Sequence, residues 1–197
     1  MAKVFVGPEC RVSFPSVWRP AAGFDASADP KYSVKLLFSP DTDFTPLAEE
    51  GRRAISERNL DINFQLPGKK VNQGNNWEKH YPQELGEWHA LNSKRPAKLG
   101  PPRVVRMENG AQVDVSEEDN LLRPGCWVRP VLGAFAYDYK GIKKGVMFNV
   151  NALIILPKPY EPFGSGGSSE LDDVIASANV GDLPVRSVED DIDNASW

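Results

Sequence analysis

The sequence predicts a mostly β protein with one helix, a long irregular insertion and an acidic C-terminal tail. The 17 prolines and 16 glycines are spread along the 197 residues, which argues against long helices and favours short strands joined by loops. Apolar residues alternate with other residues around residue 35 and again beyond residue 125, which is typical of strands with one buried face. A body of about 160 residues is large enough for one domain with a single core.

The charge is divided unevenly along the chain. Residues 161–197 contain nine acidic residues and one basic residue, whereas residues 1–160 carry 22 Lys and Arg against 18 Asp and Glu. The run 163–169 (FGSGGSS) between them has the composition of a flexible linker. We therefore expect a folded domain over residues 1–160, followed by a flexible linker and disordered acidic tail over residues 161–197. An acidic arm beside a mildly basic body indicates nucleic-acid binding.

The first half of the body is expected to contain short strands and one helix. Alternating apolar residues predict strands at residues 3–6, 11–14 and 32–38. A loop is expected at residues 19–30. The helix is expected at residues 44–59, where apolar residues recur at helical spacing between charged ones.

Residues 67–102 form the expected insertion, because they are polar, aromatic and interrupted by Pro and Gly without a sustained period. A connection this long in a compact domain is usually functional or disordered, and its aromatic content argues against disorder. Trp77 and Tyr81 could cap the core or stack on a nucleic-acid base, and the sequence leaves both open. A strand at residues 88–92 is expected to lead into a basic patch at residues 94–98.

The strongest structural signal is a β-hairpin over residues 125–156, with its turn at residues 140–145. Successive side chains of a strand point to opposite faces, so the two faces of each arm can be separated. The even positions of the first arm are small and apolar. In the second arm the residues expected to share the core are Val146, Phe148, Val150, Ala152 and Ile154.

The other face of this hairpin has the composition of a single-strand binding surface. Unpaired bases stack on aromatic rings, cations neutralise phosphates, and asparagine bonds to bases or sugars without strict sequence preference. The residues expected on this outer face are Trp127, Arg129, Phe135, Tyr137, Tyr139, Asn149 and Asn151. The alternative is that these aromatic side chains are buried in a barrel or under the insertion.

Catalytic signatures are lacking in the body. It contains no phosphate-binding glycine motif, nucleophile elbow or two-metal acidic cluster. Cys10 and Cys126 are expected to be buried thiols, and a metal site around His80 and His89 is a weak alternative. We expect a non-enzymatic protein with no cofactor or metal. The N-terminus lacks an apolar leader and no apolar run approaches ~18 residues, so we expect a cytoplasmic protein without membrane association.

Several short motifs, taken in order, resemble those of single-stranded DNA-binding proteins of tailed phages. They are the segments 31–38, 92–96, 125–129 and 135–142 and the strand that carries Asn149 and Asn151. The resemblance implies an OB-fold, a five-stranded, partly open barrel whose sheet face and loops bind oligonucleotides. It also implies non-catalytic, sequence-tolerant binding of single-stranded DNA in phage DNA replication and recombination, in the host cytoplasm.

The resemblance also implies roles for individual residues. The expected stacking residues are Trp127, Phe135, Tyr137 and Trp88. The expected phosphate contacts are Arg129, Lys94, Arg95, Lys143 and Lys144.

The acidic tail is expected to compete with DNA for the basic surface and to dock a replication protein such as DNA polymerase. Its expected docking residues are Asp190, Asp191, Ile192, Asp193 and Trp197. The alternative function is a non-enzymatic, β-rich virion, assembly or interaction module with an acidic docking tail.

Overall fold

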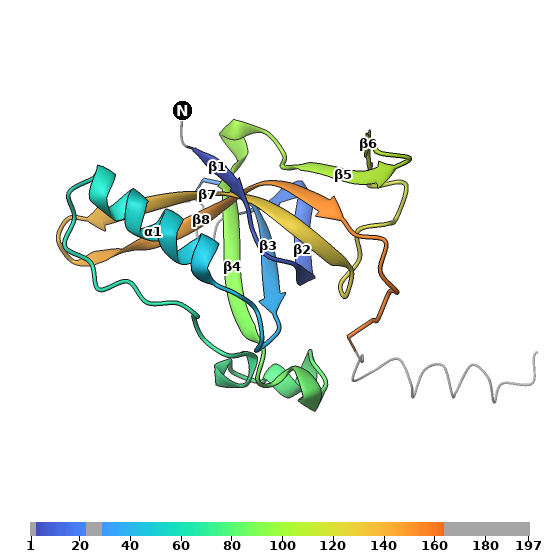
Figure 1. Cartoon of the computed structure of the whole chain (residues 1–197), viewed down its shortest axis with the longest axis horizontal. Helices are drawn as coiled ribbons and strands as arrows, with labels where there is room; N and C mark the ends of the chain where they lie inside the picture. The colour runs from blue at the N-terminus through green and yellow to red at the C-terminus, as the bar shows by residue number, and fades with distance from the viewer. Residues whose placement is uncertain (1–2, 23–28, 164–197) are drawn as a thin grey trace, which may run out of the picture. The chain divides into compact units, whose positions relative to one another are not determined.

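The computed structural model describes residues 3–22 and 29–163 (Figure 1). Within these ranges one α-helix, α1 (Thr45–Glu57), accompanies eight strands. The strands are β1 (Val4–Val6), β2 (Cys10–Ala21), β3 (Lys31–Phe38), β4 (His89–Pro96), β5 (Arg103–Glu108), β6 (Ala111–Asp114), β7 (Trp127–Tyr139) and β8 (Lys143–Ile155). Short 3-10 helices occur at Val71–Gln73, Trp77–Lys79, Gln83–Leu85 and Ala97–Leu99. The mostly β class with one α-helix is confirmed.

The strands form one sheet in the order β4-β3-β2-β7-β8-β5-β6, and β1 pairs with β7. β2, β3, β4, β7 and β8 make the five-stranded, partly open barrel that was expected. No backbone ladder joins β4 to β8 among the described strands. Two side-chain hydrogen bonds bridge this opening: Ser93 Oγ donates to the Phe148 carbonyl oxygen at 2.7 Å, and Arg95 Nη1 donates to Asn151 Oδ1 at 2.6 Å.

The core lies inside this barrel. Side chains from β2, β3, β7 and β8 are buried there, and Leu47 and Ala54 of α1 join them. β4 contributes the partly buried Leu91 and the buried Ser93. Phe148 lies at the centre, with its ring centroid 6.2 Å from that of Phe5 and 6.4 Å from that of Phe64. Gly51 lets α1 pack closely against the ring of Phe64, because a Cβ at this position would lie 2.2 Å from that ring.

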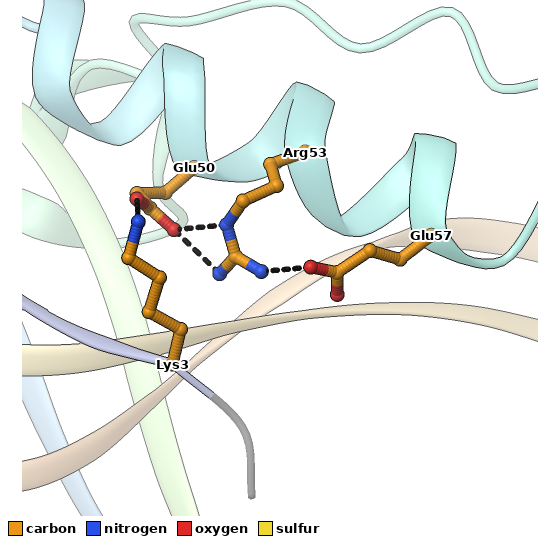
Figure 2. A network of polar contacts seen from close by, with 4 residues as sticks. All are labelled: Lys3, Glu50, Arg53 and Glu57. Carbon is orange, nitrogen blue, oxygen red and sulfur yellow. Dashed lines mark hydrogen bonds and ion pairs between the residues drawn. The ribbon is translucent and has the colours of Figure 1, made fainter.

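The outer surface of α1 is tied to the N-terminal segment by charged side chains. Glu50 accepts a 2.7 Å hydrogen bond from Arg53 Nε and lies 3.9 Å from Lys3 Nζ, and Arg53 also binds Glu57 (Figure 2). The hydrogen bond to Glu50 raises the pKa of Arg53. Ion pairs at the protein surface, such as those that Lys3 and Glu57 form here, contribute little to stability. The position of α1 therefore depends on its buried face.

The structure corrects several expected elements. β1 pairs with the distant β7 and not with β2, the next strand in the sequence, and the amide of Gly7 continues this pairing by donating to the carbonyl of Pro130. β2 continues to Ala21, where a loop was expected. The expected basic patch begins within β4, and the β5–β6 hairpin was not predicted.

The assignment of residues to the core face and the outer face of the long hairpin is correct for β7 but only partly correct for β8. Val128, Leu132 and Ala136 of β7 are buried. The register between β7 and β8 shifts between Val131 and Leu132, which places one extra residue in β8. An extra residue reverses the alternation that follows it. Leu153 is therefore buried in the core, and the expectation that Ala152 and Ile154 fill it was wrong.

Candidate nucleic-acid interface

The structure divides the expected aromatic surface into two groups. β2 pairs with β7 only through Cys10–Val128 and Arg11–Trp127, so only the first part of β7 lies beside β2. There Trp127 meets Trp88 from the insertion, with ring centroids 5.9 Å apart. Phe135, Tyr137 and Tyr139 lie in the other half of the hairpin, where β7 still pairs with β8 but no longer with β2. At a rise of roughly 3.3 Å per residue, the two ends of β7 are separated by up to about 40 Å.

Polar side chains line the outer face of β2, β3 and β4. Paired residues of neighbouring strands project to the same side of a sheet, so these side chains form rows across it. One row across the sheet consists of Ser13, Lys35 and Asn92. The next row pairs Ser33 with Lys94. The ammonium group of Lys35 and the side-chain amide of Asn92 therefore lie side by side on the outer face. Val34 and Leu36, the neighbours of Lys35 in β3, point to the other face and are buried in the core.

The insertion covers the neighbouring row of this face. Val71, Tyr81 and Leu85 are buried against Leu37 in a second small core, and Trp77 and Trp88 pack at its edge. The hydroxyl groups of Tyr81 and Ser13 share a hydrogen bond of 2.8 Å. Tyr81 thus caps a core, which is the first of the two alternatives that the sequence left open, and its hydroxyl group borders the polar row.

Phe14 is a candidate stacking residue that the sequence did not reveal. Alternation from the buried Val12 would point it into the barrel, but an irregularity in the β2–β3 register begins at Ser13. Phe14 has φ of 46° and its side chain is 52% exposed on the outer face. Positive φ is uncommon for a bulky residue, and such strain is concentrated at functional sites. The available signal was an aromatic residue before a proline inside a strand.

Two hollows meet on this face. The first has a volume of about 290 Å³ and includes Lys35, Lys69, Trp77, His80, Tyr81 and Asn92 in its lining. The second, of about 270 Å³, is lined by Phe14, Ser33, Val34, Lys35, Asn92, Ser93 and Lys94. Lys35 and Asn92 belong to both. We call the combined depression the outer groove.

Lys35 occupies the middle of the outer groove. Its Nζ lies 5.2 Å from the ring centroid of Phe14 and 5.5 Å from that of Tyr81. The ring of His80 meets Phe14 edge-on at 5.4 Å. No carboxylate of residues 3–22 or 29–163 forms an ion pair with Lys35 or Lys94. The groove therefore combines aromatic edges and faces with cations that no described acidic group neutralises.

Arg11 fixes the segment 157–163 against the outer face of β2. Its guanidinium donates to the carbonyl oxygens of Gly125 and Glu161, and its Cζ lies 4.6 Å from the ring centroid of Phe163. Burial lowers the pKa of Arg11, and the carboxylate of Glu161 opposes that shift. An arginine stays charged in proteins regardless, so Arg11 is a permanent cation beside the aromatic residues.

Gly125 permits this close approach, and Gly125→Ala should displace the segment 157–163. Gly125 has φ of +102°, and a Cβ there would lie 2.2 Å from the carbonyl oxygen of Glu161. We expect the free energy of unfolding to fall by about 1–3 kcal/mol, measured by urea denaturation, and chymotrypsin to cleave more rapidly after Tyr160. Gly141→Ala is the control, because Gly141 has φ of +72° but no atom within 4 Å of the added Cβ. Equal protease sensitivity of the two variants would contradict the prediction.

Several of the expected phosphate contacts have partners within the chain. Arg95 donates to Leu99, Gly100 and Asn151, which ties the end of β4 to β8. Arg129 is exposed, with its Nε 3.9 Å from the carboxylate of Glu9. Lys144 is exposed and its Nζ lies 3.6 Å from the carboxylate of Asp138, whereas Lys94 and Lys143 are exposed with no ion pair to another described residue.

The distal half of the hairpin presents a second aromatic surface. Phe135 is 44% exposed, with the guanidinium carbon of Arg58 5.1 Å from its ring centroid. Tyr137 is half buried, since its ring lies across Gly145 of the paired strand. The remaining members of this surface are the exposed Tyr139 and the half-buried Asn149 and Asn151. The expected docking residues Asp190, Asp191, Ile192, Asp193 and Trp197 lie outside the described residues.

The structure separates the two histidines of the alternative metal site. His80 contacts Phe14 and Tyr81, whereas the ring of His89 meets Phe44. Among residues 3–22 and 29–163, no group of three His, Cys, Asp or Glu side chains could hold a metal ion. In the same part of the chain, no helix has the length and apolarity needed to span a membrane. Cys10 and Cys126 are buried free thiols, as expected.

The arrangement of the barrel is that of an oligonucleotide-binding fold, and solved structures share it. The single-stranded DNA-binding protein of bacteriophage Enc34 in complex with single-stranded DNA aligns with a TM-score of 0.59 and 21% identity, over 82% of this chain and 89% of that chain. Its C-terminal truncation aligns with a TM-score of 0.59 and 22% identity, over 81% and 88% of the two chains.

The likeness extends to a second phage. The gp2.5 single-stranded DNA-binding protein of bacteriophage T7 aligns with a TM-score of 0.53 and 13% identity, over 88% of this chain and 95% of that chain. No family model and no curated protein matches the sequence. The chain therefore has the fold of phage single-stranded DNA-binding proteins, as the resemblance implied.

Proposed function

We propose that this protein binds single-stranded DNA without strict sequence preference, and that the outer groove is its principal binding surface. The observation that carries the proposal is Lys35, a cation with no described acidic partner, lying between the rings of Phe14 and Tyr81. In an OB-fold, the outer face of the second and third barrel strands usually binds oligonucleotides. β3 and β4 are the second and third barrel strands of this chain. The shared fold of a protein solved in complex with single-stranded DNA supports the proposal.

The binding mechanism combines stacking with charge neutralisation. The exposed ring of Phe14 offers a surface for one base, and stacking contributes ~1–3 kcal/mol per base. Lys35 and Lys94 neutralise phosphates, and Asn92 bonds to sugars or base edges. Trp127 and Trp88 extend the surface along β7. This binding involves no covalent chemistry, so we propose a non-enzymatic role.

The distal hairpin supplies a second surface for the same strand. The connection between the last two barrel strands is one of the loops that contact oligonucleotides in this fold. Its proposed contacts are Phe135, Tyr137, Tyr139, Lys143, Lys144, Asn149 and Asn151. The exposure of Phe135 favours this role over a purely structural module, in which its ring would be buried.

We further propose a role in phage DNA replication and recombination in the host cytoplasm, with the acidic tail docking a replication protein such as DNA polymerase. The charge division supports this, since eight acidic residues and one basic residue follow residue 164. A tethered polyanion competes for a basic groove at an effective concentration set by its linker. Binding of DNA would then release the tail for its partner.

Titration with a single-stranded oligonucleotide tests the proposed function. Trp77, Trp88 and Trp127 border the outer groove or its extension, so their fluorescence should be quenched on binding. The logarithm of the affinity should fall with the logarithm of the salt concentration, with a slope of about −0.7 per neutralised phosphate. Duplex DNA of the same length should bind more weakly. Binding that is independent of salt, or equal for duplex, would contradict the proposal.

Removing residues 165–197 should tighten single-strand binding, most strongly at low salt, because screening weakens the competing tail as salt rises. The measurement is the ratio of affinities of the truncated and full-length chains at low and high salt. A full-length variant with the tail Asp and Glu replaced by Asn and Gln is the control, since it keeps the tail length. Equal affinities of the full-length and truncated chains at low salt would rule out competition by the tail.

A further inference from the structure

A second aromatic and cationic hollow lies beside Trp127, outside the outer groove. Its volume is about 300 Å³, and β5, the start of β7 and the segment after β8 surround it. Its floor includes Leu121 and Leu156. We call it the Tyr160 pocket. The residues whose chemistry defines it are Arg106, Arg123, Trp127, Lys158 and Tyr160.

The Tyr160 pocket pairs each of two aromatic rings with a cation. Lys158 Nζ lies 4.6 Å from the ring centroid of Trp127, and the guanidinium carbon of Arg123 lies 4.6 Å from that of Tyr160. Lys158 also binds the carboxylate of Glu9. No carboxylate of the described ranges pairs with Arg123. An aromatic ring beside a cation is the arrangement that receives a base together with its phosphate.

Arg106 adds a cation to the lining of the pocket, next to Glu108, which also lines it. Its Nη2 lies 2.8 Å from the carboxylate of Glu108, but its Nε is buried and has no hydrogen-bond partner among the described residues. A buried donor without an acceptor costs about 1–3 kcal/mol. The Arg106 side chain as a whole is 41% exposed, so its outer guanidinium nitrogens are accessible to a phosphate in the pocket.

Trp127 connects this pocket to the rest of the surface. It lines the Tyr160 pocket, meets Trp88 at 5.9 Å, and pairs across the sheet with Arg11. The ring of Phe163 lies against Arg11 and 5.4 Å from the ring of Tyr81, which lines the outer groove, so the aromatic series continues through Phe163. A single strand that leaves the outer groove along Trp88 and Trp127 therefore arrives at the Tyr160 pocket.

We propose that the Tyr160 pocket is a second nucleotide subsite, which binds a nucleotide of the same single strand after it passes Trp127. The base stacks on Tyr160, and Arg123 and Arg106 contact the adjacent phosphate. This inference rests on the proposed function. It predicts that the site is longer than the outer groove alone and that only longer oligonucleotides reach the pocket.

A length series of oligothymidylates tests the subsite with full-length protein. The single strands should run from about 4 to about 16 nucleotides, the range of site sizes for one OB-fold. Tyr160→Leu should bind the longest strand about 5- to 100-fold more weakly than the unaltered protein and the shortest strand equally well. Tyr160→Phe keeps the ring and should bind like the unaltered protein.

The charge in the pocket is tested in the same series. Arg123→Ala should lower the affinity for long strands and reduce the salt slope by about 0.7. Arg52→Ala is the matched control, because Arg52 is an exposed arginine of α1 with no ion pair to another described residue. Urea denaturation of each variant separates loss of binding from loss of folding.

The possible outcomes separate this inference from the function on which it rests. If the unaltered protein binds no single strand of any length, the proposed function fails. If it binds but Tyr160→Leu matches it at every length, the subsite is refuted. If Tyr160→Leu abolishes binding of a labelled peptide of residues 189–197 while DNA binding is unchanged, the pocket serves the acidic tail and the inference is also overturned.

Discussion

Phe14→Ala should weaken the binding of single-stranded DNA by about 1–3 kcal/mol, which corresponds to a loss of affinity of about 5- to 150-fold. The reason is that the exposed ring of Phe14 stands at the outer groove beside Lys35. Because the ring is only partly covered in the free protein, its removal should change the free energy of unfolding much less. Fluorescence anisotropy of a labelled oligonucleotide measures the affinity, and urea denaturation measures the stability.

Phe135→Ala is the matched comparison for Phe14. Both residues are phenylalanines on outer faces, with similar exposed fractions of 52% and 44%, but Phe135 lies in the distal hairpin. We expect Phe14→Ala to lose more affinity than Phe135→Ala. The reverse order would mean that the strand lies mainly on the hairpin surface expected from the sequence, and that Lys35 and its neighbours are peripheral.

Phe148→Ala should lower the free energy of unfolding by about 3–5 kcal/mol, the usual cost of truncating a buried phenylalanine. Phe148 is almost fully buried and contacts Phe5 and Phe64, so the cavity would lie between elements that cannot easily close it. Its backbone carbonyl also accepts the hydrogen bond from Ser93 that bridges the open side of the barrel. Urea denaturation at equilibrium measures the effect.

Phe148→Leu provides the graded control for this prediction. It retains most of the apolar volume, so its cost should be clearly smaller than that of alanine. Leu is accommodated at the neighbouring positions Leu132 and Leu153, both fully buried in the same core. A cost below about 1 kcal/mol for Phe148→Ala would show that the barrel interior does not depend on this residue.

The parts of the fold that local pattern determines could be predicted from the sequence. The helix and the two faces of β7 follow from the spacing of apolar residues over one continuous segment. The pairing of β1 with β7 joins residues more than a hundred positions apart, and no local pattern encodes it. Ala152 and Ile154 were wrongly assigned to the core because β8 contains one extra residue at the register shift. Strict alternation along a strand does not allow for such a residue.

The candidate site was predictable only in part. Trp127 was expected from the alternation of side chains along β7, and Trp88 and Lys94 were expected from the resemblance to phage single-stranded DNA-binding proteins. Lys35 was visible as a polar position of an alternating strand, but its partners come from the insertion and from β2. Phe14 was missed because its outward position results from a backbone irregularity with positive φ, and a period of two predicts the opposite face.

Photo-crosslinking can show whether single-stranded DNA lies on the outer face of β2, β3 and β4. An oligonucleotide carrying iododeoxyuridine is irradiated in complex with the full-length protein, and the modified residues are identified by mass spectrometry. We expect adducts on Phe14, Tyr81 or Trp88. Adducts confined to the distal hairpin, on Phe135 or Tyr139, would contradict this expectation.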